Sequence, residues 1–364
     1  MSDTAGAGTP EGAGPVREED SFDVGAVAAW LREHAAEPFR GELDGTPEVL
    51  QFAGGASNLT YLLRYPRHDL ILRRAPRGTK ARGAHDMGRE HRIQAALRPV
   101  FPYVPAMVAF CDDVEVVGAE FYVMKRIDGV VPRGDLRPDA VTPEQARGMC
   151  LAMVDVLVEL HSVDPVAAGL ESLGKGHGYV RRQVEGWSSR YRDARTDDAP
   201  DFEATMAWLD EHQPDDVRNC VIHNDFKMDN LVFDRADPTK VVGVLDWEMA
   251  TLGDPLMDLG GNLAFWVEAE DDAGFQRFRR VPTHLPGMIT RAEFVERYCE
   301  RMGLAVTPEQ WRFYEIFGLF RLAVITQQIY YRWFHGQTSN ELFAHFGPAV
   351  HVADRRIKEL LGWE

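Results

Sequence analysis

The chain has 364 residues, of which 45% are hydrophobic, which is enough for about two domains that each bury a core. A formal net charge of −17 disfavours nonspecific binding to nucleic acid or to an anionic membrane, since both depend on basic surface. No apolar run of about 18 residues occurs, and the chain does not start with a basic and then apolar segment, so neither a membrane span nor a secretory signal is expected. The four cysteines are widely spaced and form neither a zinc pattern nor a dense disulfide framework, which favours reduced thiols in a cytoplasmic protein.

Residues 21–126 are expected to form a small lobe with an antiparallel sheet and one main helix. Residues 1–20, which are rich in glycine, alanine, proline and acids, are expected to form a mobile tail before it. In chain order, the predicted elements are a helix over 24–36 capped by Ser21 or Asp23, a strand over 51–53, paired strands over 61–65 and 70–74, a helix over 85–97 and a strand over 121–124.

A glycine pair follows the first of these strands. Gly54 and Gly55 have no Cβ, so their backbone N–H groups are able to approach phosphate oxygens closely. Ser57 and Asn58 add side-chain donors to the same loop. Taken alone, the two glycines are explained equally well by a plain hairpin turn.

The strand over 70–74 carries a candidate phosphate ligand. Side chains alternate across a strand, so Ile71 and Arg73 share one face. If Ile71 lines a pocket for adenine, Arg73 points at the phosphates.

Residues 127–364 are expected to form a larger, mostly helical lobe. Thr142 is a predicted N-cap, with Pro143 at the first helical position and Gln145 completing a capping box. Further helices are predicted over 179–194, 201–212, 291–302 and 308–334. Together with the small lobe, this makes the expected fold class α+β.

The run His223-Asn224-Asp225-Phe226-Lys227-Met228-Asp229-Asn230 has the spacing H-x-D-x-x-x-x-N. The five-residue step lets a loop turn back so that the Asp225 carboxylate and the Asn230 carboxamide face one cleft. A predicted hairpin over 231–245 then returns the chain to Asp246. Transfer of a phosphoryl group requires a carboxylate that takes the proton of the acceptor hydroxyl, here Asp225, and oxygen ligands for Mg²⁺, here Asn230 and Asp246. The alternative is that this segment is only a solvated acidic turn.

Several neighbouring residues allow two interpretations. His223 braces the loop by hydrogen bonding or transfers protons, and Lys227 neutralises the transferring phosphate or is simply solvated. Arg321 lies within an apolar helical pattern and needs either a loop carboxylate (Glu248, Asp254 or Asp258) or an anionic part of an acceptor. Four aromatic residues form either core or an acceptor wall: Trp266, Tyr330, Tyr331 and Trp333.

Two segments, 221–225 and 246–259, together resemble the aminoglycoside phosphotransferase and choline kinase superfamily. Residues 54–61 (Gly-Gly-Ala-Ser-Asn-Leu-Thr-Tyr) and 317–323 (Phe-Gly-Leu-Phe-Arg-Leu-Ala) are similar to one branch of it, which includes the kinase-like N-terminal domain of certain acyl-CoA dehydrogenase family proteins. The resemblance covers about residues 22–360 and implies a two-lobed, protein-kinase-like fold.

The resemblance also implies roles for individual residues. Met124 is expected to back the adenine pocket, with the backbone of Lys125 and Ile127 bonding the adenine edge. Arg73 stands where the better-known pattern has a lysine that grips the phosphates and pairs with a helix glutamate, a departure that bears on the efficiency of catalysis. Glu90, on the helix over 85–97, is then the expected ion-pair partner of Arg73; the alternative is that both are ordinary surface charges. Asp258 is expected to bond the loop that carries Asp225.

The expected function is therefore transfer of the γ-phosphate of ATP, or less commonly GTP, to a hydroxyl of a small molecule, with Mg²⁺ as the cofactor. A hydroxyacyl-type acceptor follows from the nearest branch, and an aminoglycoside or amino-alcohol acceptor follows from the wider superfamily. A catalytically silent nucleotide-binding regulator is a third possibility, suggested by Arg73. The oligomeric state is not indicated by the sequence.

Overall fold

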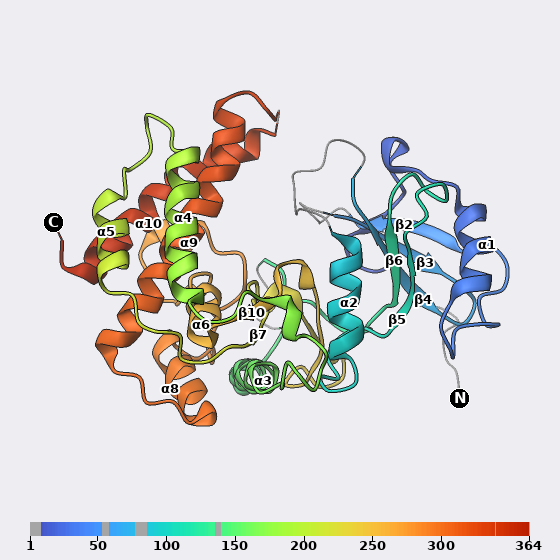
Figure 1. Ribbon diagram of the computed structural model, residues 1–364, viewed down its shortest axis with the longest axis horizontal. Coiled ribbons are helices and arrows are strands. Elements are labelled where there is room, and N and C mark those ends of the chain that lie inside the picture. The colour runs from blue at the N-terminus through green and yellow to red at the C-terminus, as the bar shows by residue number, and fades with distance from the viewer. Residues whose placement is uncertain (1–8, 53–57, 77–85, 135–139, 339, 364) are drawn as a thin grey trace. The chain divides into compact units, whose positions relative to one another are not determined.

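The computed structural model describes residues 9–52, 58–76, 86–134, 140–338 and 340–363 (Figure 1). The chain folds into two units. Unit 1 comprises Met1–Asp128 and Gly243–Glu248, and unit 2 comprises Gly129–Val242 and Met249–Glu364. The first contains an antiparallel sheet and the second is mostly helical, so the expected kinase-like α+β fold class is confirmed.

Unit 1 is built on a six-stranded antiparallel sheet with the order β1-β2-β3-β4-β6-β5. Its strands are β1 (Ala13–Gly14), β2 (Glu48–Phe52), β3 (Leu59–Arg64), β4 (Asp69–Arg74), β5 (Met107–Cys111) and β6 (Phe121–Lys125). Its helices are η1 (Glu18–Asp20), α1 (Val24–His34) and α2 (Met87–Leu97). Asp23 caps α1 and Asp86 caps α2, each by accepting a main-chain N–H of the first turn.

The alternation of side chains along the strands gives this sheet two buried faces. Leu70 and Leu72 of β4 pack with α1, whereas Ile71 packs with Met87 of α2 and Tyr122 of β6. Figure 1 shows the two helices on opposite sides of the sheet. Arg73 therefore lies on the α2 face, as its alternation with Ile71 predicts.

The expectation of a mobile tail over residues 1–20 is wrong for the part that the structure describes. β1 pairs with β2, so the sheet begins before the predicted boundary. Arg74, which is fully buried, donates to the carbonyl of Asp20 at 2.7 Å and lies over the ring of Phe22, 5.9 Å from its centroid. The composition of the segment suggested disorder, but these contacts hold it against β4.

Unit 2 contains the remaining elements, except that β9 and η4 cross the boundary between the units. The strands of unit 2 are β7 (Cys220–Ile222), β8 (Leu231–Phe233) and β10 (Thr251–Gly253), with β7 paired to β10. β8 pairs with β9 (Val241–Val244), which begins in unit 2 and ends in unit 1. The α-helices of unit 2 are α3 (Pro143–His161), α4 (Tyr179–Ala194), α5 (Glu203–Glu211), α6 (Pro255–Leu263), α7 (Ala273–Arg277), α8 (Arg291–Met302), α9 (Pro308–Phe334) and α10 (Phe346–Leu361). Short 3₁₀ turns are η2 (Glu171–Leu173), η3 (Met228–Asn230) and η5 (Glu341–His345), and η4 (Trp247–Met249) runs from unit 1 into unit 2.

The helix α9 forms the centre of unit 2, with α4, α6 and α10 packed around it (Figure 1). Its predicted start is confirmed, because Thr307 makes a capping box with Gln310 and Pro308 occupies the first turn. α6 crosses α9 at two glycines. A Cβ on Gly260 would lie 2.3 Å from the carbonyl oxygen of Tyr314, and one on Gly318 would lie 2.1 Å from the carbonyl oxygen of Gly260. This close approach fixes the position of α6, which carries Asp258.

Among the helices of the described part of the chain, none combines the length and the apolar character that a membrane crossing requires.

Candidate active site

The loop after β7 carries three of the residues selected from the sequence, and the structure brings them together within unit 2. Asn230 Nδ2 donates to the main-chain carbonyl of Asp225 at 2.9 Å and to its carboxylate Oδ2 at 2.8 Å. Lys227 Nζ lies 3.2 Å from the same Oδ2. Phe226 and Met228 are buried and anchor the loop, while the side chains of Asp225 and Lys227 stay partly exposed.

These hydrogen bonds leave one oxygen available on each of the two polar side chains. In the part of the chain that the structure describes, neither Asp225 Oδ1 nor Asn230 Oδ1 accepts a hydrogen bond. A carboxylate oxygen is suited to receive a proton, and a carboxamide oxygen is a ligand that hard cations accept. The loop therefore presents one carboxylate oxygen and one carboxamide oxygen whose neighbouring atoms are already fixed, as the predicted base and metal ligand require.

Lys227 is held between a carboxylate and an aromatic ring instead of being freely solvated. Its ammonium lies 5.0 Å from the centroid of Phe265, which follows α6, and pairs with Asp225. Burial raises the pKa of the neighbouring Asp229, and the charge of Lys227 offsets part of that effect. The position of Lys227 beside the candidate base is thus set by unit 2 itself.

Asp258 of α6 holds the backbone of this loop. Its carboxylate is fully buried and accepts the main-chain N–H groups of His223 and Asn224, each at 2.8 Å. It also lies 3.1 Å from Nε2 of His161, whose Nδ1 is 2.5 Å from the hydroxyl of Tyr298. Burial alone raises the pKa of Asp258, but the hydrogen bond from His161 and the other neighbours outweigh it and lower the pKa below its ordinary value. The expected contact of Asp258 with the loop is confirmed.

His223 also braces the loop, since its Nδ1 accepts the main-chain N–H of Asp225 at 3.2 Å. Its side chain is buried, which agrees with the bracing interpretation. His161 and Tyr298 were not found from the sequence. The sequence does place His161 on the buried face of a predicted helix. It does not identify its partners, because Asp258 and Tyr298 lie 97 and 137 positions further along the chain.

Asn224 is a further residue that sequence reasoning missed. Its φ of 64° is left-handed, a conformation that asparagine tolerates better than most residues. Tyr179 donates its hydroxyl to Asn224 Oδ1 at 3.1 Å, and Asn224 Nδ2 donates to the carbonyl of Met249 at 3.1 Å. Arg321 Nη2 donates to the Asn224 carbonyl at 2.6 Å.

The ion pair expected for Arg321 is therefore wrong. Its guanidinium bonds a main-chain carbonyl and lies 5.4 Å from the centroid of Trp187, and the described residues give it no carboxylate partner. Asp254 instead caps α6 by accepting the N–H groups of Leu256 and Met257. A backbone acceptor is able to satisfy a buried arginine without leaving any mark in the sequence.

The aromatic residues near the end of the chain fit the core interpretation where they are buried. Trp266 donates its indole N–H to the carbonyl of Ile289 at 3.0 Å, and Tyr330 donates its hydroxyl to Asp198 at 2.7 Å. Both side chains are buried, whereas Tyr331 and Trp333 are partly exposed.

In unit 1, Arg73 joins two of the predicted site residues. Its Nη1 donates to Glu90 Oε1 of α2 at 2.6 Å, and its Nη2 donates to Asp246 Oδ1 at 3.1 Å. The side chains of Arg73 and Glu90 are 10% and 2% exposed, so the alternative of two surface charges is wrong and the predicted ion pair is confirmed. Burial, the largest influence, opposes the charge of Arg73, but Tyr122, Glu90 and Asp246 outweigh it and raise its pKa. Burial also raises the pKa of Glu90, and Arg73 offsets only part of this effect.

Asp246 is presented by a rigid turn after β9. The indole N–H of Trp247 donates to the carbonyl of Val244 at 2.9 Å, and its fully buried ring packs edge-on against Phe101. Asp246 itself has a left-handed φ of 66°, and its side chain is 36% exposed. One of its oxygens bonds Arg73, which leaves the other for a cation.

The glycine loop is only partly described. Gly54, Gly55 and Ser57 lie outside the described residues. Asn58, expected as a donor to phosphate, donates through Nδ2 to Glu248 Oε2 at 3.0 Å, and Arg89 of α2 donates to the Glu248 carbonyl at 3.1 Å. The end of the loop is thus tied to the segment that carries Asp246, within unit 1.

The predicted adenine-pocket residues lie at neighbouring positions of the sheet. Ile71 and Met124 are directly opposite each other on β4 and β6, and both are buried on the α2 face. The N–H of Lys125 already donates to the carbonyl of Ala106 at 2.8 Å, so only its carbonyl remains for a ligand. Ile127 follows β6, and its main-chain N–H makes no hydrogen bond with any residue described in the structure.

The donor set fits Mg²⁺ bound together with phosphates. Over the described residues, no group of three or more His, Cys, Asp or Glu is close enough to hold a metal alone. Mg²⁺ commonly takes one or two protein carboxylate or amide ligands and completes its shell with phosphate and water. Asn230 Oδ1 in unit 2 and the second oxygen of Asp246 in unit 1 are each a ligand of this kind.

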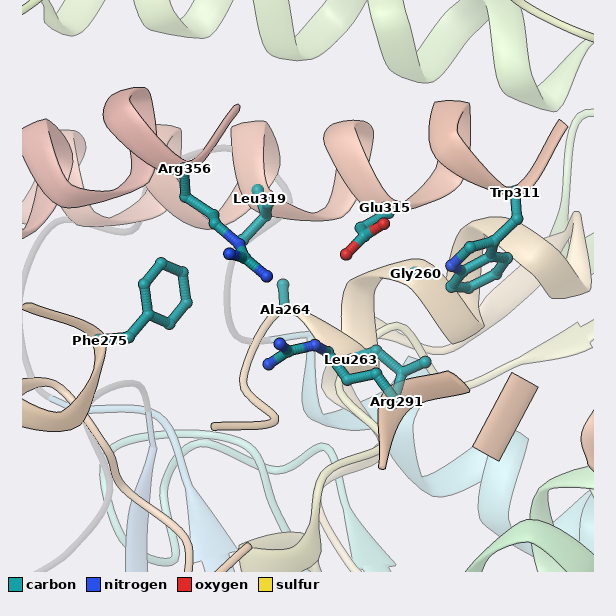
Figure 2. A pocket seen from close by; sticks show the side chains of 9 residues that line it. All are labelled: Gly260, Leu263, Ala264, Phe275, Arg291, Trp311, Glu315, Leu319 and Arg356. Carbon is teal, nitrogen blue, oxygen red and sulfur yellow. The ribbon is translucent and has the colours of Figure 1, made fainter. Parts of the chain in front are cut away.

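A small cavity lies elsewhere in unit 2, among α6, α7, α8, α9 and α10. Figure 2 shows Glu315, Arg291 and Arg356 pointing into it from three helices, with Phe275 and Trp311 at its sides. Arg291 is already paired with both oxygens of Asp271, at 2.6 and 2.8 Å. The Glu315 carboxylate makes no hydrogen bond or ion pair with any residue in the described ranges.

This arrangement predicts that Glu315→Gln stabilises the fold at neutral pH. Burial raises the pKa of Glu315, and the attraction of Arg291 and Arg356 offsets only part of that effect. Because the folded-state pKa lies above the unfolded one, stability falls as the pH rises from the unfolded pKa through the folded pKa. The variant should melt at a higher temperature than the unaltered chain at neutral pH, and the difference should shrink in acid. Thermal unfolding at both pH values, with the exposed Glu300→Gln as the control, tests this; a lower melting temperature at neutral pH contradicts it.

The comparison with known proteins agrees with this geometry. Residues 48–313 match the model of the phosphotransferase enzyme family. The acyl-CoA dehydrogenase family member 10 of Mus musculus is 37% identical over 327 residues, which make up 90% of this chain and 30% of that protein. The chain spans less than half the length of the curated acyl-CoA dehydrogenase family relatives that it matches.

Two solved structures share the fold. A crystal structure from Ralstonia eutropha JMP134, named provisionally as an aminoglycoside phosphotransferase, is 30% identical, with a TM-score of 0.78 over 94% of this chain and 100% of that chain. A thermostable mutant of aminoglycoside phosphotransferase APH(4)-Ia, in a ternary complex with AMP-PNP and hygromycin B, is 16% identical, with a TM-score of 0.56 over 92% of this chain and 97% of that chain. The fold, the loop motif and the matched family model together place this chain in the phosphotransferase enzyme family, within the aminoglycoside phosphotransferase and choline kinase superfamily.

Proposed function

We propose that this protein transfers the γ-phosphoryl group of ATP to a hydroxyl group of a small molecule. The observation that carries the proposal is the arrangement on the loop after β7, where Asn230 and Lys227 fix Asp225 and leave one of its carboxylate oxygens available. A phosphotransferase needs such a base at the acceptor hydroxyl. GTP is the alternative donor.

In this mechanism Asp225 accepts the proton of the acceptor hydroxyl. The acceptor oxygen then forms its bond to the γ-phosphorus, the bond from that phosphorus to the bridging oxygen breaks, and ADP leaves with the electron pair. Lys227 balances negative charge beside the base. Mg²⁺, when bound, neutralises charge on the phosphates, and Asn230 and Asp246 are the residues that would hold it.

The nucleotide is proposed to bind on the α2 face of the sheet in unit 1. Arg73 binds phosphate, with Glu90 fixing its fork, and the loop that contains Gly54, Gly55, Ser57 and Asn58 adds donors. Ile71 and Met124 contact adenine, and the carbonyl of Lys125 and the N–H of Ile127 bond its edge. The complex of APH(4)-Ia with the ATP analogue AMP-PNP supports a nucleotide in this fold.

For the acceptor, we propose a hydroxyacyl-type molecule, because curated relatives that are 37% and 32% identical are acyl-CoA dehydrogenase family members. The alternative is an aminoglycoside or amino alcohol, supported by the hygromycin B complex of APH(4)-Ia and by the acidic balance of the chain. Phosphate transfer from ATP to panels of hydroxy acids and amino sugars separates the two. Transfer to amino sugars alone would remove the hydroxyacyl assignment.

A nucleotide-binding regulator without transfer activity is the second class of function, favoured only by Arg73 in the place of a lysine. Mg²⁺-dependent ATP binding without turnover on either panel, or on water, would support it. We further propose that the protein acts in the cytoplasm, because its cysteines are widely spaced and unpaired in the described residues.

Replacement of Arg73 tests its assignment to the phosphates. Arg73→Lys keeps the positive charge but loses the fork that contacts Glu90 and Asp246 together. We expect the KM for ATP to rise roughly tenfold to a hundredfold, the equivalent of about 1.5 to 3 kcal/mol for hydrogen bonds to a charged group.

Steady-state kinetics with varied ATP measures this effect. Arg64→Lys, on the neighbouring strand β3, is the matched control and should keep the KM unchanged. An unchanged KM in Arg73→Lys would remove Arg73 from nucleotide binding.

A further inference from the structure

Asn224, the residue before the proposed base Asp225, has a hydrogen-bond partner for every one of its polar groups. Asn224 has four polar groups, and each of them is bonded: its N–H to Asp258, its carbonyl to Arg321, its side-chain oxygen to Tyr179 and its side-chain nitrogen to the carbonyl of Met249. The bonded groups come from α6, α9, α4 and η4. An exposed turn residue does not need so many partners, since water would satisfy it.

These hydrogen bonds fix the two peptide planes that flank Asn224. The N–H bonded by Asp258 belongs to the peptide between residues 223 and 224, and the carbonyl bonded by Arg321 belongs to the peptide between 224 and 225. With both planes held, the dihedral angles of Asn224 are set, including its left-handed φ of 64°. The direction in which the chain enters Asp225 is then set as well.

Arg321 and Tyr179 are themselves held in place. The Arg321 guanidinium lies over the ring of Trp187 on α4, and it packs against Gly261 of α6, where a Cβ would approach its Nη1 to 2.7 Å. Tyr179 is buried at the start of α4, and burial raises the pKa of its hydroxyl, so the hydroxyl stays protonated and donates. Both donors are therefore rigid parts of the helical core of unit 2.

We infer that Tyr179 and Arg321 are positioning residues for phosphoryl transfer, acting through Asn224 to align Asp225. This inference rests on the proposed function, in which Asp225 is the base. It assigns to α4 and α9 a task in the reaction, although neither helix carries a residue of the loop motif. The hydrogen bond from Nη2 to the loop backbone gives Arg321 a role that does not require an anionic acceptor.

A double-mutant cycle separates positioning from general packing. Tyr179→Phe removes only the hydroxyl that bonds Asn224, and Asn224→Gly keeps the left-handed backbone but removes the amide that Tyr179 bonds. If Tyr179 acts through that amide, Tyr179→Phe should have an effect in the unaltered chain and none in the Asn224→Gly background.

The first measurement is amide hydrogen exchange of residues 221–231 in the full chain without ligands, which does not depend on any turnover. Tyr179→Phe should speed exchange of this segment roughly fivefold, as expected for loss of one hydrogen bond of about 1 kcal/mol, and should not speed it further beside Asn224→Gly. Tyr330→Phe is the matched control, since it removes a buried hydroxyl bonded to Asp198 instead of to the loop. Equal effects of Tyr179→Phe in both backgrounds, or no effect on the loop, would overturn the inference.

The second measurement is the kinetics of phosphate transfer or ATP hydrolysis. Tyr179→Phe should lower kcat several-fold with the KM for ATP unchanged, and Arg321→Lys, which keeps a donor, should retain more activity than Arg321→Met. A change confined to the KM for ATP would count against positioning. If the unaltered chain turns over no substrate, the proposed function fails, and the exchange data still decide whether Tyr179 and Arg321 hold the loop.

Discussion

Asp225→Asn should keep binding of Mg²⁺ and ATP but lower turnover by on the order of 10² to 10⁴, the range associated with a positioned general base. The asparagine oxygen is able to replace Asp225 Oδ2 as the acceptor for Asn230 Nδ2 and Lys227, so the loop keeps its hydrogen bonds. The other oxygen becomes an amide nitrogen, which does not accept a proton at neutral pH. The geometry is retained and the base is lost.

The measurement is kcat for phosphate transfer, together with the dissociation constant for ATP in the presence of Mg²⁺. Asp237→Asn is the matched control, because Asp237 lies in the exposed turn between β8 and β9 and bonds only its own turn. Equal turnover in Asp225→Asn and the unaltered chain would remove Asp225 from the mechanism. Loss of ATP binding in this variant would instead show that Asp225 supports the nucleotide.

Asp258→Asn should reduce both stability and turnover. In this variant an amide NH₂ group replaces one carboxylate oxygen, and it cannot accept a hydrogen bond. It would face a donor, either the N–H groups of His223 and Asn224 or the ring of His161. Each buried donor left without an acceptor costs on the order of 1 to 3 kcal/mol. The two N–H groups belong to the loop of Asp225, so turnover should fall along with the melting temperature.

The pH dependence gives this prediction a second readout. The folded-state pKa of Asp258 is lowered, so its charge contributes stability that is present above the unfolded pKa and is lost as the pH falls through the folded pKa. Asp258→Asn should therefore show a smaller loss of stability in acid than the unaltered chain. Asp164→Asn, which changes an exposed carboxylate that also accepts a main-chain N–H, is the control. A melting temperature equal to that of the unaltered chain at neutral pH would contradict the role of Asp258.

The sequence was sufficient for several of the elements and for the residues of the loop motif. Periodicity predicted α4, α8 and α9 with the bounds observed, because this signal is local. The alternation along β4 predicted that Arg73 and Ile71 share a face, and the kinase pattern that the chain resembles predicted the pairing of Arg73 with Glu90. The H-x-D-x-x-x-x-N spacing predicted that Asp225 and Asn230 lie together.

What the sequence did not provide was the identity of distant partners. Arg321 bonds a main-chain carbonyl 97 positions away, and any residue type offers such a carbonyl. The N–H of Lys125 likewise donates to the main-chain carbonyl of Ala106. Such a bond depends on the backbone and not on the residue type, so the sequence does not show it. In the sequence, Asn224 occupies only the unspecified position of the H-x-D motif. In the structure, its left-handed φ and its four hydrogen-bond partners make it part of the support for the proposed base.

Residues 13–20 contact the sheet through β1 and Asp20, and this affects where the chain should start when the protein is expressed. A shortened chain that starts at residue 21 would lose β1. It would also lose Asp20, whose carbonyl accepts a hydrogen bond from the fully buried Arg74 and whose carboxylate accepts one from the side chain of Gln51. Arg74 is adjacent to Arg73, so the damage would reach the strand that carries the proposed phosphate ligand. Residues 13–20 are therefore a poor place for a cleavage site. A tag is better separated from them by a linker that leaves Ala13 free to pair with β2.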